Sequence, residues 1–152
     1  MAWKSYKLDE CAQRLVLNHR NTEVLNETHK MRMTVAYGLE RFWGERFRLE
    51  KNNKAKAEYW QATWEELVKI MGTAKLKIPN DPIDIPNDWK NEEENVRYTR
   101  QLQEMADKLW KLDDRQESDN GENFNQTRRK VALAVLTQLC DCMVWWAQRY
   151  KK

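Results

Sequence analysis

The sequence predicts an all-α protein, a single-domain bundle of about five helices in which residues 1-152 form one helical unit. The chain contains only four glycines and three prolines in 152 residues, too few for the frequent turns of a β-sandwich, a barrel or a doubly wound sheet. Charged residues make up 34% of the chain and hydrophobic residues 41%, which is typical of amphipathic helices around one core. Apolar residues recur at spacings of three and four along most of the chain.

The first two predicted helices lie in the N-terminal third. The first covers about Asp9–Asn18, and the carboxylate of its first residue is a plausible N-cap. The second starts after a short polar break and can extend over Thr22–Lys51, because its apolar residues keep the helical spacing throughout. Gly38 and Gly44 lie inside this range, and each weakens a helix by about 1 kcal/mol.

The third predicted helix, Lys54–Met71, is followed by a change of pattern. Asn52 or Asn53 can cap its start, and Gly72 stands where a glycine often ends a helix. Residues 73-87 contain all three prolines, which lack the amide hydrogen that a helix needs and favour extended backbone. We expect an ordered extended loop here, because its isoleucines can hold it against the bundle.

The C-terminal half is predicted to contain two further helices. Asn87 can cap a fourth helix over about Asp88–Leu112, whose acidic first turn suits the positive end of the helix dipole. Residues 113-123 contain no apolar side chain and are predicted to form a mobile polar loop. The last helix, Phe124–Tyr150, has the widest apolar stripe, so we expect it to be the central helix, buried on several sides.

The sequence favours a cytoplasmic protein without a membrane partner. It contains no run of eighteen apolar residues that could span a bilayer, and its first residues lack the apolar core of a secretion signal. Of its three cysteines, Cys140 and Cys142 lie too close along a helix to form a disulfide. We therefore expect reduced thiols and a cytoplasmic location.

The net charge of +3 hides an uneven distribution. Residues 30–56 hold eight basic residues against three acidic ones, and residues 124–152 hold six against one, a net charge of +5 in each segment. Residues 81–123 hold six basic and thirteen acidic residues, a net charge of −7. Such a chain can present a basic face to a polyanion, or its opposite segments can neutralise each other inside the bundle.

Most enzyme motifs are absent, so we expect a protein that is not an enzyme and has no cofactor. The chain has no glycine-rich phosphate or dinucleotide loop and no His-Glu-x-x-His zinc motif. One alternative remains: Arg14 and His19 match the Arg-x4-His pattern and resemble the signature of HEPN-type helical ribonucleases. That resemblance implies a histidine acid/base and an arginine that holds phosphate, although Leu15 stands where the family usually has a polar residue.

The basic segment 30–56 contains the first candidate RNA contacts. Cations that neutralise phosphates and aromatic rings that stack on bases suit nucleic acid. Helical spacing separates the cations: Arg46 falls on the apolar stripe, whereas Arg41, Arg48 and Lys51 lie on roughly the opposite side. A bend at Gly44 would free Arg46. The candidates in this segment are Arg41, Arg46, Arg48, Lys51, Lys54 and Lys56.

The last helix supplies the remaining candidates. Its first turns contain Arg128, Arg129 and Lys130, which oppose the helix dipole and call for compensation by the acidic residues before them or by an external polyanion. Arg149 lies near the C-terminus and is a further candidate RNA contact. Trp145 and Tyr150 are candidate partner contacts because Trp and Tyr are enriched at protein interfaces.

The segment Cys140–Tyr150 resembles the terminal helix of the small subunit of type III CRISPR effector complexes, in which aromatic and small residues precede a basic end. The resemblance implies a non-catalytic subunit of an antiviral ribonucleoprotein. Its copies stack beside the backbone subunits and line the guide–target RNA duplex without cutting it. The implied partners are RNA, other effector subunits and copies of itself. A protein-only helical adaptor, in which the acidic middle of one copy meets the basic ends of another, remains an alternative.

Overall fold

The computed structural model describes the backbone of residues 2–110 and 126–151 and the side chains from Lys7 onward. Every regular element in this part of the chain is helical, which confirms the predicted all-α class. The elements in chain order are α1 (Ala2–Asn18), α2 (Thr22–Leu25), α3 (Glu27–Thr34), the 3₁₀ turn η1 (Val35–Tyr37), α4 (Leu39–Leu49), α5 (Lys54–Thr73), α6 (Glu92–Trp110) and α7 (Gln126–Tyr150). The described residues therefore form more helical elements than the five predicted, because the predicted second helix is divided into several short ones.

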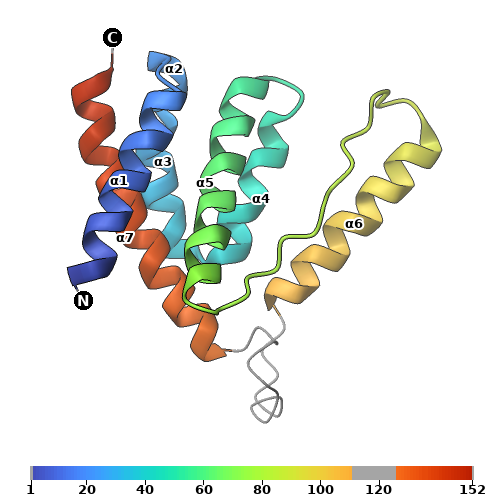
Figure 1. The fold of residues 1–152 in the computed structure, drawn as a ribbon. Coiled ribbons are helices and arrows are strands. Elements are labelled where there is room, and N and C mark those ends of the chain that lie inside the picture. Colours follow the sequence, from blue (N-terminus) through green and yellow to red (C-terminus); the bar gives the residue numbers. More distant parts are fainter. Residues whose placement is uncertain (1, 111–125, 152) are drawn as a thin grey trace.

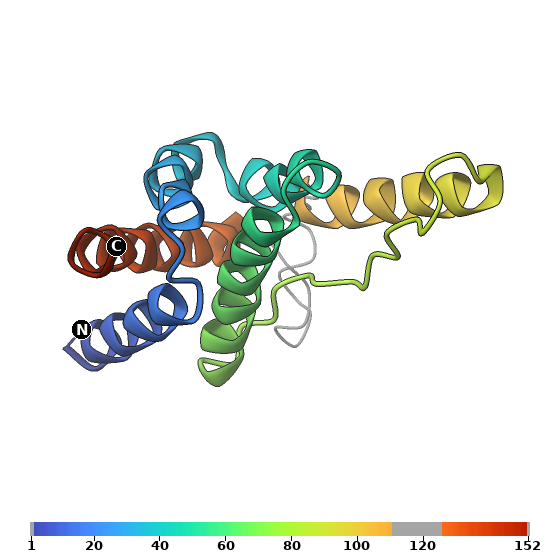
Figure 2. The same cartoon turned by 90° about the horizontal axis from the view of Figure 1, so that it is seen from above.

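Helix α7 packs along α1 and also contacts α3 and α5, whereas α4 and α5 form an antiparallel pair (Figure 1). Helix α6 projects away from these helices as an arm, with the chain that leads into it running alongside (Figure 2). The core consists of large side chains from almost every element, of which the following are nearly inaccessible to solvent: Leu8, Leu25, Met31, Leu39, Phe42, Tyr59, Trp60, Leu67, Met71, Met105, Leu109 and Leu136.

Helix α7 has the length and composition to cross a membrane, with a mean hydropathy of 1.3 over its most apolar window, of which 33% is buried. It is the one such helix among those that the structure describes. Central helices of helical bundles pass the same test, and seven α7 side chains are buried against the other helices.

The predicted helix Thr22–Lys51 is wrong as a single element. It breaks first at Asn26 and again at Gly38, where φ is +107°. A Cβ at Gly38 would lie 2.8 Å from Oε1 of Glu40, so this backbone conformation requires glycine. The bend at Gly38 turns the chain from η1 into α4 and lets both pieces bury their apolar sides.

The predicted starts of two helices also differ from the structure. Helix α1 already begins at Ala2, so Asp9 lies inside it, and its carboxylate accepts a hydrogen bond from Nε1 of Trp146 at 2.8 Å. Helix α6 begins at Glu92, where Oδ1 of Asn91 accepts the Glu94 amide at 3.1 Å, so Asn91 replaces Asn87 as the cap. At the start of α5, Oδ1 of Asn53 accepts the Lys56 amide at 3.2 Å, which confirms one of the two predicted caps.

Helix α5 ends differently from the prediction, because Gly72 lies inside it. Lys75 has a positive φ of 64°, the Lys75 amide donates to the Gly72 carbonyl at 3.0 Å, and the Leu76 amide donates to the Met71 carbonyl at 2.8 Å. These two bonds form a Schellman motif, in which glycine is the usual residue at the left-handed position. The motif folds Leu76 back against the helix.

The proline-containing segment between α5 and α6 has neither helix nor strand, and it lies along α6. The Asp84 amide donates to Oε1 of Gln101 at 2.7 Å, and Nζ of Lys108 lies 2.6 Å from Oδ2 of Asp81. Ile78 is buried in the core. The proline-containing segment and α6 thus stabilise each other through these contacts. The predicted mobile loop, residues 113-123, lies outside the described residues.

A buried carboxylate joins α3 to α5. Glu27 is 0% exposed, and its Oε1 accepts a hydrogen bond from Nε1 of Trp60 at 3.0 Å. Its Oε2 lies 3.1 Å from Nζ of Lys30 and 3.7 Å from Nζ of Lys56. Burial alone would raise the pKa of Glu27, but the Trp60 hydrogen bond and the two lysines outweigh it, so the pKa lies below its ordinary value.

Replacing Lys75 with glycine should raise the free energy of unfolding by about 0.5–1 kcal/mol, because glycine adopts positive φ without the Cβ strain. Chemical denaturation measures the change. Lys75→Ala removes the same charge and keeps the Cβ, so it should leave stability nearly unchanged. Equal stabilisation by both variants would show that charge, and not backbone strain, limits this turn.

Replacing Glu27 with glutamine should lower the free energy of unfolding at pH 7 by about 2 kcal/mol, since the two lysine ion pairs are lost. A carboxyl with a lowered folded pKa stabilises the fold above its ordinary pKa of about 4.3, and this contribution is lost as pH falls through the folded value. Denaturation from pH 7 to pH 3 should therefore show a smaller loss of stability for the variant than for the wild type. Parallel curves would contradict this role.

Candidate nucleic-acid interface

Helix α4 has a buried face and a charged outer face. Leu39, Phe42 and Leu49 are buried, whereas Arg41 and Arg48, seven residues apart, are exposed on the opposite side. Lys51 follows the end of the helix and is also exposed. We call Arg41, Arg48 and Lys51 the α4 cationic stripe. The separation of the stripe from the buried face agrees with the predicted helical spacing.

Aromatic rings flank both ends of the stripe. The guanidinium carbon of Arg41 lies 5.8 Å from the ring centroid of Tyr37, a residue that is 66% exposed. Nζ of Lys51 lies 4.5 Å from the ring centroid of Trp89, which approaches from the segment before α6. Neither ring was among the contacts predicted from the sequence. The spacing of four between Tyr37 and Arg41 could have indicated the first, but only the tertiary fold places Trp89 near Lys51.

Arg48 is tied to its own helix by an exposed ion pair. Its Nε and Nη2 lie 2.9 and 2.6 Å from Oε2 of Glu45, and its side chain remains 58% exposed. The hydrogen bond from Arg48 to Glu45 raises the pKa of the arginine. An exposed pair of this kind is worth at most about 0.5 kcal/mol, so a phosphate can compete for the guanidinium at little cost.

Arg46 must be removed from the candidate RNA contacts. Helix α4 continues through Gly44 without the bend that would free the side chain, and Arg46 is only 9% exposed. Its guanidinium carbon lies 4.4 Å from the ring centroid of Phe47, and its Nε has no hydrogen-bond partner among the described residues. Burial lowers the pKa of Arg46 despite the nearby carboxylates of Glu50 and Glu65.

The two lysines at the start of α5 differ in their surroundings. Lys54 is exposed, and two residues separate it from Lys51 across the turn. Lys56 is half-buried and faces the Glu27 carboxylate at 3.7 Å. Lys54 therefore remains a candidate phosphate contact, whereas Lys56 serves the buried ion pair inside the fold.

The arginines at the start of α7 make contacts within the chain. Nη1 of Arg129 donates to the Leu109 carbonyl at 2.7 Å, and Nη2 forms an ion pair with Glu40. Arg129 thus joins α7 to α4 and to the end of α6, so the carboxylate that compensates it comes from α4 and not from an external polyanion. Arg128 is half-buried and makes contacts of its own. Lys130 is exposed.

The aromatic end of α7 has one outward and one inward ring. Trp145 is 49% exposed, and the guanidinium carbon of Arg149 lies 3.9 Å from its ring centroid. Tyr150 stacks on Trp146 at 5.5 Å, and its hydroxyl accepts a hydrogen bond from Nε2 of Gln13 at 3.0 Å. Trp145 therefore remains a candidate partner contact, while Tyr150 helps to hold α7 to α1. Arg149 lies about 30 Å along α7 from Arg129.

The Arg-x4-His pair has separate environments. Arg14 forms an ion pair with Glu66 of α5. His19 has its Nδ1 2.8 Å from the Leu15 carbonyl oxygen, and its ring centroid lies 4.9 Å from that of Tyr59. The described residues therefore bring no phosphate-binding arginine to the histidine within one copy.

The cysteines do not form a reactive site. Burial is the main cause that raises the pKa of each thiol, to about 11 for Cys11 and upward for Cys140 and Cys142. The thiols therefore stay protonated at neutral pH. In the part of the chain that the structure describes, no group of three His, Cys, Asp or Glu side chains is placed to hold a metal ion.

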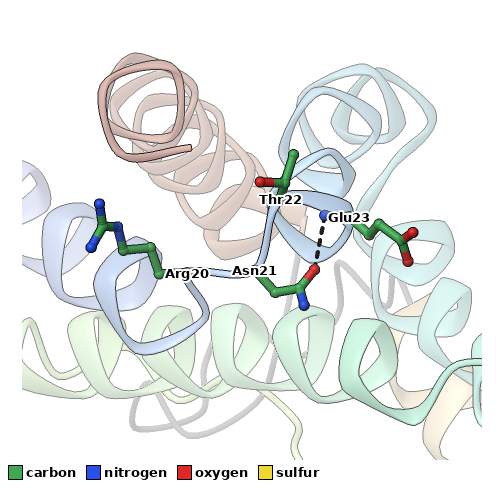
Figure 3. Close-up of a pocket in the computed structure, with 4 residues that line it drawn as sticks. All are labelled: Arg20, Asn21, Thr22 and Glu23. Atoms are coloured by element: carbon green, nitrogen blue, oxygen red, sulfur yellow. Dashed lines mark hydrogen bonds between the residues drawn. The ribbon is translucent and has the colours of Figure 1, made fainter. Parts of the chain in front are cut away.

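A surface hollow at the turn between α1 and α2 carries no convergent set of side chains. It is lined by Arg20, Asn21, Thr22 and Glu23 (Figure 3). Oδ1 of Asn21 accepts the Glu23 amide at 2.9 Å, and Nε of Arg20 donates to the Tyr150 carbonyl at 2.9 Å. Because these groups serve the fold, the α4 cationic stripe is the stronger candidate interface.

Replacing Arg129 with alanine should lower the free energy of unfolding by about 2 kcal/mol, because Glu40 is left half-buried without its partner. Hydrogen exchange should also become faster at the C-terminal end of α6, where the Leu109 carbonyl loses its donor. Lys130→Ala removes the neighbouring exposed charge and should change neither quantity. Similar effects of the two variants would show that Arg129 does not hold α6.

Comparison with known proteins does not assign this chain. No family model matches it, and neither the curated proteins nor the solved structures contain a significant match. The candidate interface is therefore argued from geometry and charge.

Proposed function

We propose that the chain is a non-catalytic scaffold subunit of a cytoplasmic type III CRISPR ribonucleoprotein. In this role, the α4 cationic stripe and Lys54 contact the phosphates of the guide–target RNA, and exposed apolar side chains contact neighbouring subunits. Residues 1-152 act as one helical unit. The observation that carries the proposal is the outward face of α4, where exposed cations lie between two aromatic rings.

The dimensions of the stripe suit a nucleic-acid backbone. Arg41 and Arg48 are seven positions apart, about 10 Å along α4, and Lys51 extends the stripe beyond the end of the helix. Cations spread over this length can contact more than one phosphate of a nucleic-acid strand. Contacts of this kind position a nucleic acid without reading its sequence, as a subunit that follows an RNA of any guide sequence must do.

Exposed apolar side chains on several elements support the scaffold role. Met33 on α3 is 70% exposed, Val96 and Trp110 on α6 are 61% and 56% exposed, and Trp145 on α7 is 49% exposed. Aromatic and methionine side chains are enriched where proteins meet. Because these residues lie on three different helices, the chain offers separate contacts to more than one neighbour.

The internal ion pairs of Lys56 and Arg129 favour the alternative function, a protein-only helical adaptor. They reduce the positive charge available to a polyanion. In the adaptor, the acidic arm around α6 would meet basic residues of another copy, and RNA would not bind. The two functions therefore differ in one measurable property, salt-dependent affinity for RNA.

The test is RNA affinity of the triple variant Arg41→Ala/Arg48→Ala/Lys51→Ala, measured by fluorescence anisotropy with a labelled RNA duplex and a single strand. Loss of three phosphate contacts should weaken binding at least tenfold and reduce the slope of log affinity against log salt by about 3. The matched control, Lys77→Ala/Lys90→Ala/Arg100→Ala, removes the same charge from exposed positions elsewhere and should change affinity less than threefold.

Three results would contradict the RNA-contact proposal. They are no RNA binding by the wild type, alone or with its partners; equal weakening by both triple variants; and binding that is insensitive to salt between 50 and 200 mM. The first of these would favour the protein-only adaptor.

A further inference from the structure

A separate hollow of about 200 Å³ lies between α1, α5 and α7. Its wall is mainly apolar: Leu8, Met71 and Val135 are buried, and Ile70 and Val131 are half-buried. None of these residues belongs to the α4 cationic stripe, so the hollow is independent of the proposed RNA contact. Apolar side chains that line a hollow lack van der Waals partners on their open side. An apolar ligand of matching size would therefore gain these contacts there.

The rim of the hollow is positively charged. Lys7 and Arg14 come from α1 and Lys69 comes from α5, and all three are exposed. The acidic residue of the lining is Glu66, whose carboxylate already pairs with Arg14. That pair holds the Arg14 guanidinium at the rim, and the two lysines remain available to an anion.

The end of α5 closes one side of the hollow. The Schellman motif at Lys75 turns the chain so that Thr73, Ala74 and Leu76 line the hollow. A lysine in the left-handed region is strained, and strained backbone is concentrated at ligand sites. The turn thus holds an open wall that a straight continuation of α5 would not provide.

We infer that this hollow binds a small amphipathic anion, with an apolar group of about six to eight carbons inside and a carboxylate at the Lys7–Arg14–Lys69 rim. The size follows from comparison with an apolar protein cavity of about 150 Å³, which accommodates benzene. The charge follows from the rim, where Lys7 and Lys69 add their positive charges to an Arg14–Glu66 pair whose own charges cancel. Lysine side chains can reach a carboxylate at the mouth while their stems cover the apolar group.

Cys11 provides a local reporter of binding. It is half-buried in the wall, and burial together with Glu66 raises its pKa to about 11. Cys142 is also half-buried but is not part of the lining. A ligand in the hollow should therefore slow alkylation of Cys11 and leave the rate at Cys142 unchanged.

The test uses sodium octanoate as the probe, with octylamine and sodium butyrate as controls for charge and for chain length. Iodoacetamide alkylation of the full chain at pH 8.5, read by mass spectrometry, should show at least fivefold protection of Cys11 by 5 mM octanoate. Titration calorimetry should give one site with a dissociation constant of about 0.1 mM. Octylamine and butyrate should protect Cys11 less than twofold.

Two variants locate the site. Ala74→Trp, at an exposed position of the lining, should fill the hollow and abolish octanoate binding, while circular dichroism shows an intact fold. Lys7→Gln/Lys69→Gln should weaken octanoate at least fivefold, whereas Lys77→Gln, outside the hollow, should have no effect. The α4 triple variant should bind octanoate normally, so this inference and the RNA proposal fail separately.

The inference is overturned if octanoate does not protect Cys11, if octylamine protects it equally, or if Ala74→Trp leaves binding unchanged. The first result would indicate that the hollow accepts the side chain of a protein partner and not a small anion. The second would show that the cationic rim does not distinguish an anion from a cation.

Discussion

A charge that leaves water needs an opposite charge or a hydrogen bond, and this constraint shapes the helix contacts made by Glu27 and Arg129. Glu27 is fully buried between α3 and α5, where Trp60 donates a hydrogen bond to its Oε1 and two lysines lie within ion-pair distance of its Oε2. Arg129 satisfies the same requirement at the other end of the bundle by joining Glu40 and the Leu109 carbonyl. Removing one partner from such a group leaves the other uncompensated. The first group therefore joins α3 to α5, and the second joins α7 to α4 and α6.

The same constraint decides which cations remain for a partner. The two basic segments of the chain do not form one continuous positive face, because Arg46, Lys56 and Arg129 are drawn inside. The outer face of α4 keeps its cations, since the ion pair that Arg48 forms with Glu45 is exposed and weak. The proposed RNA contacts are therefore fewer than the net charge of the two basic segments would indicate. They are restricted to the outer face of α4 and Lys54.

Helical periodicity in the sequence predicted the class and most of the core, because amphipathic spacing reports which side of a helix is buried. It also placed Arg46 on the inner face of α4. It could not predict that the second helix breaks at Gly38, since the bend depends on whether both flanking segments can bury their apolar sides in the core. Nor could it find the partner of Arg129, because Glu40 is 89 positions away. The spacing of apolar residues predicts which face of a helix is buried, whereas the pairing of charges that are distant in the sequence depends on the tertiary fold.

The most direct measurement of where RNA lies is photo-crosslinking of the assembled ribonucleoprotein with 4-thiouridine in the RNA, followed by mass spectrometry of the crosslinked peptides. The proposed function predicts crosslinks in residues 37–54, which contain the stripe, Tyr37 and Lys54. Crosslinks confined to residues 128–149, or none in an assembly that contains RNA, would contradict the account.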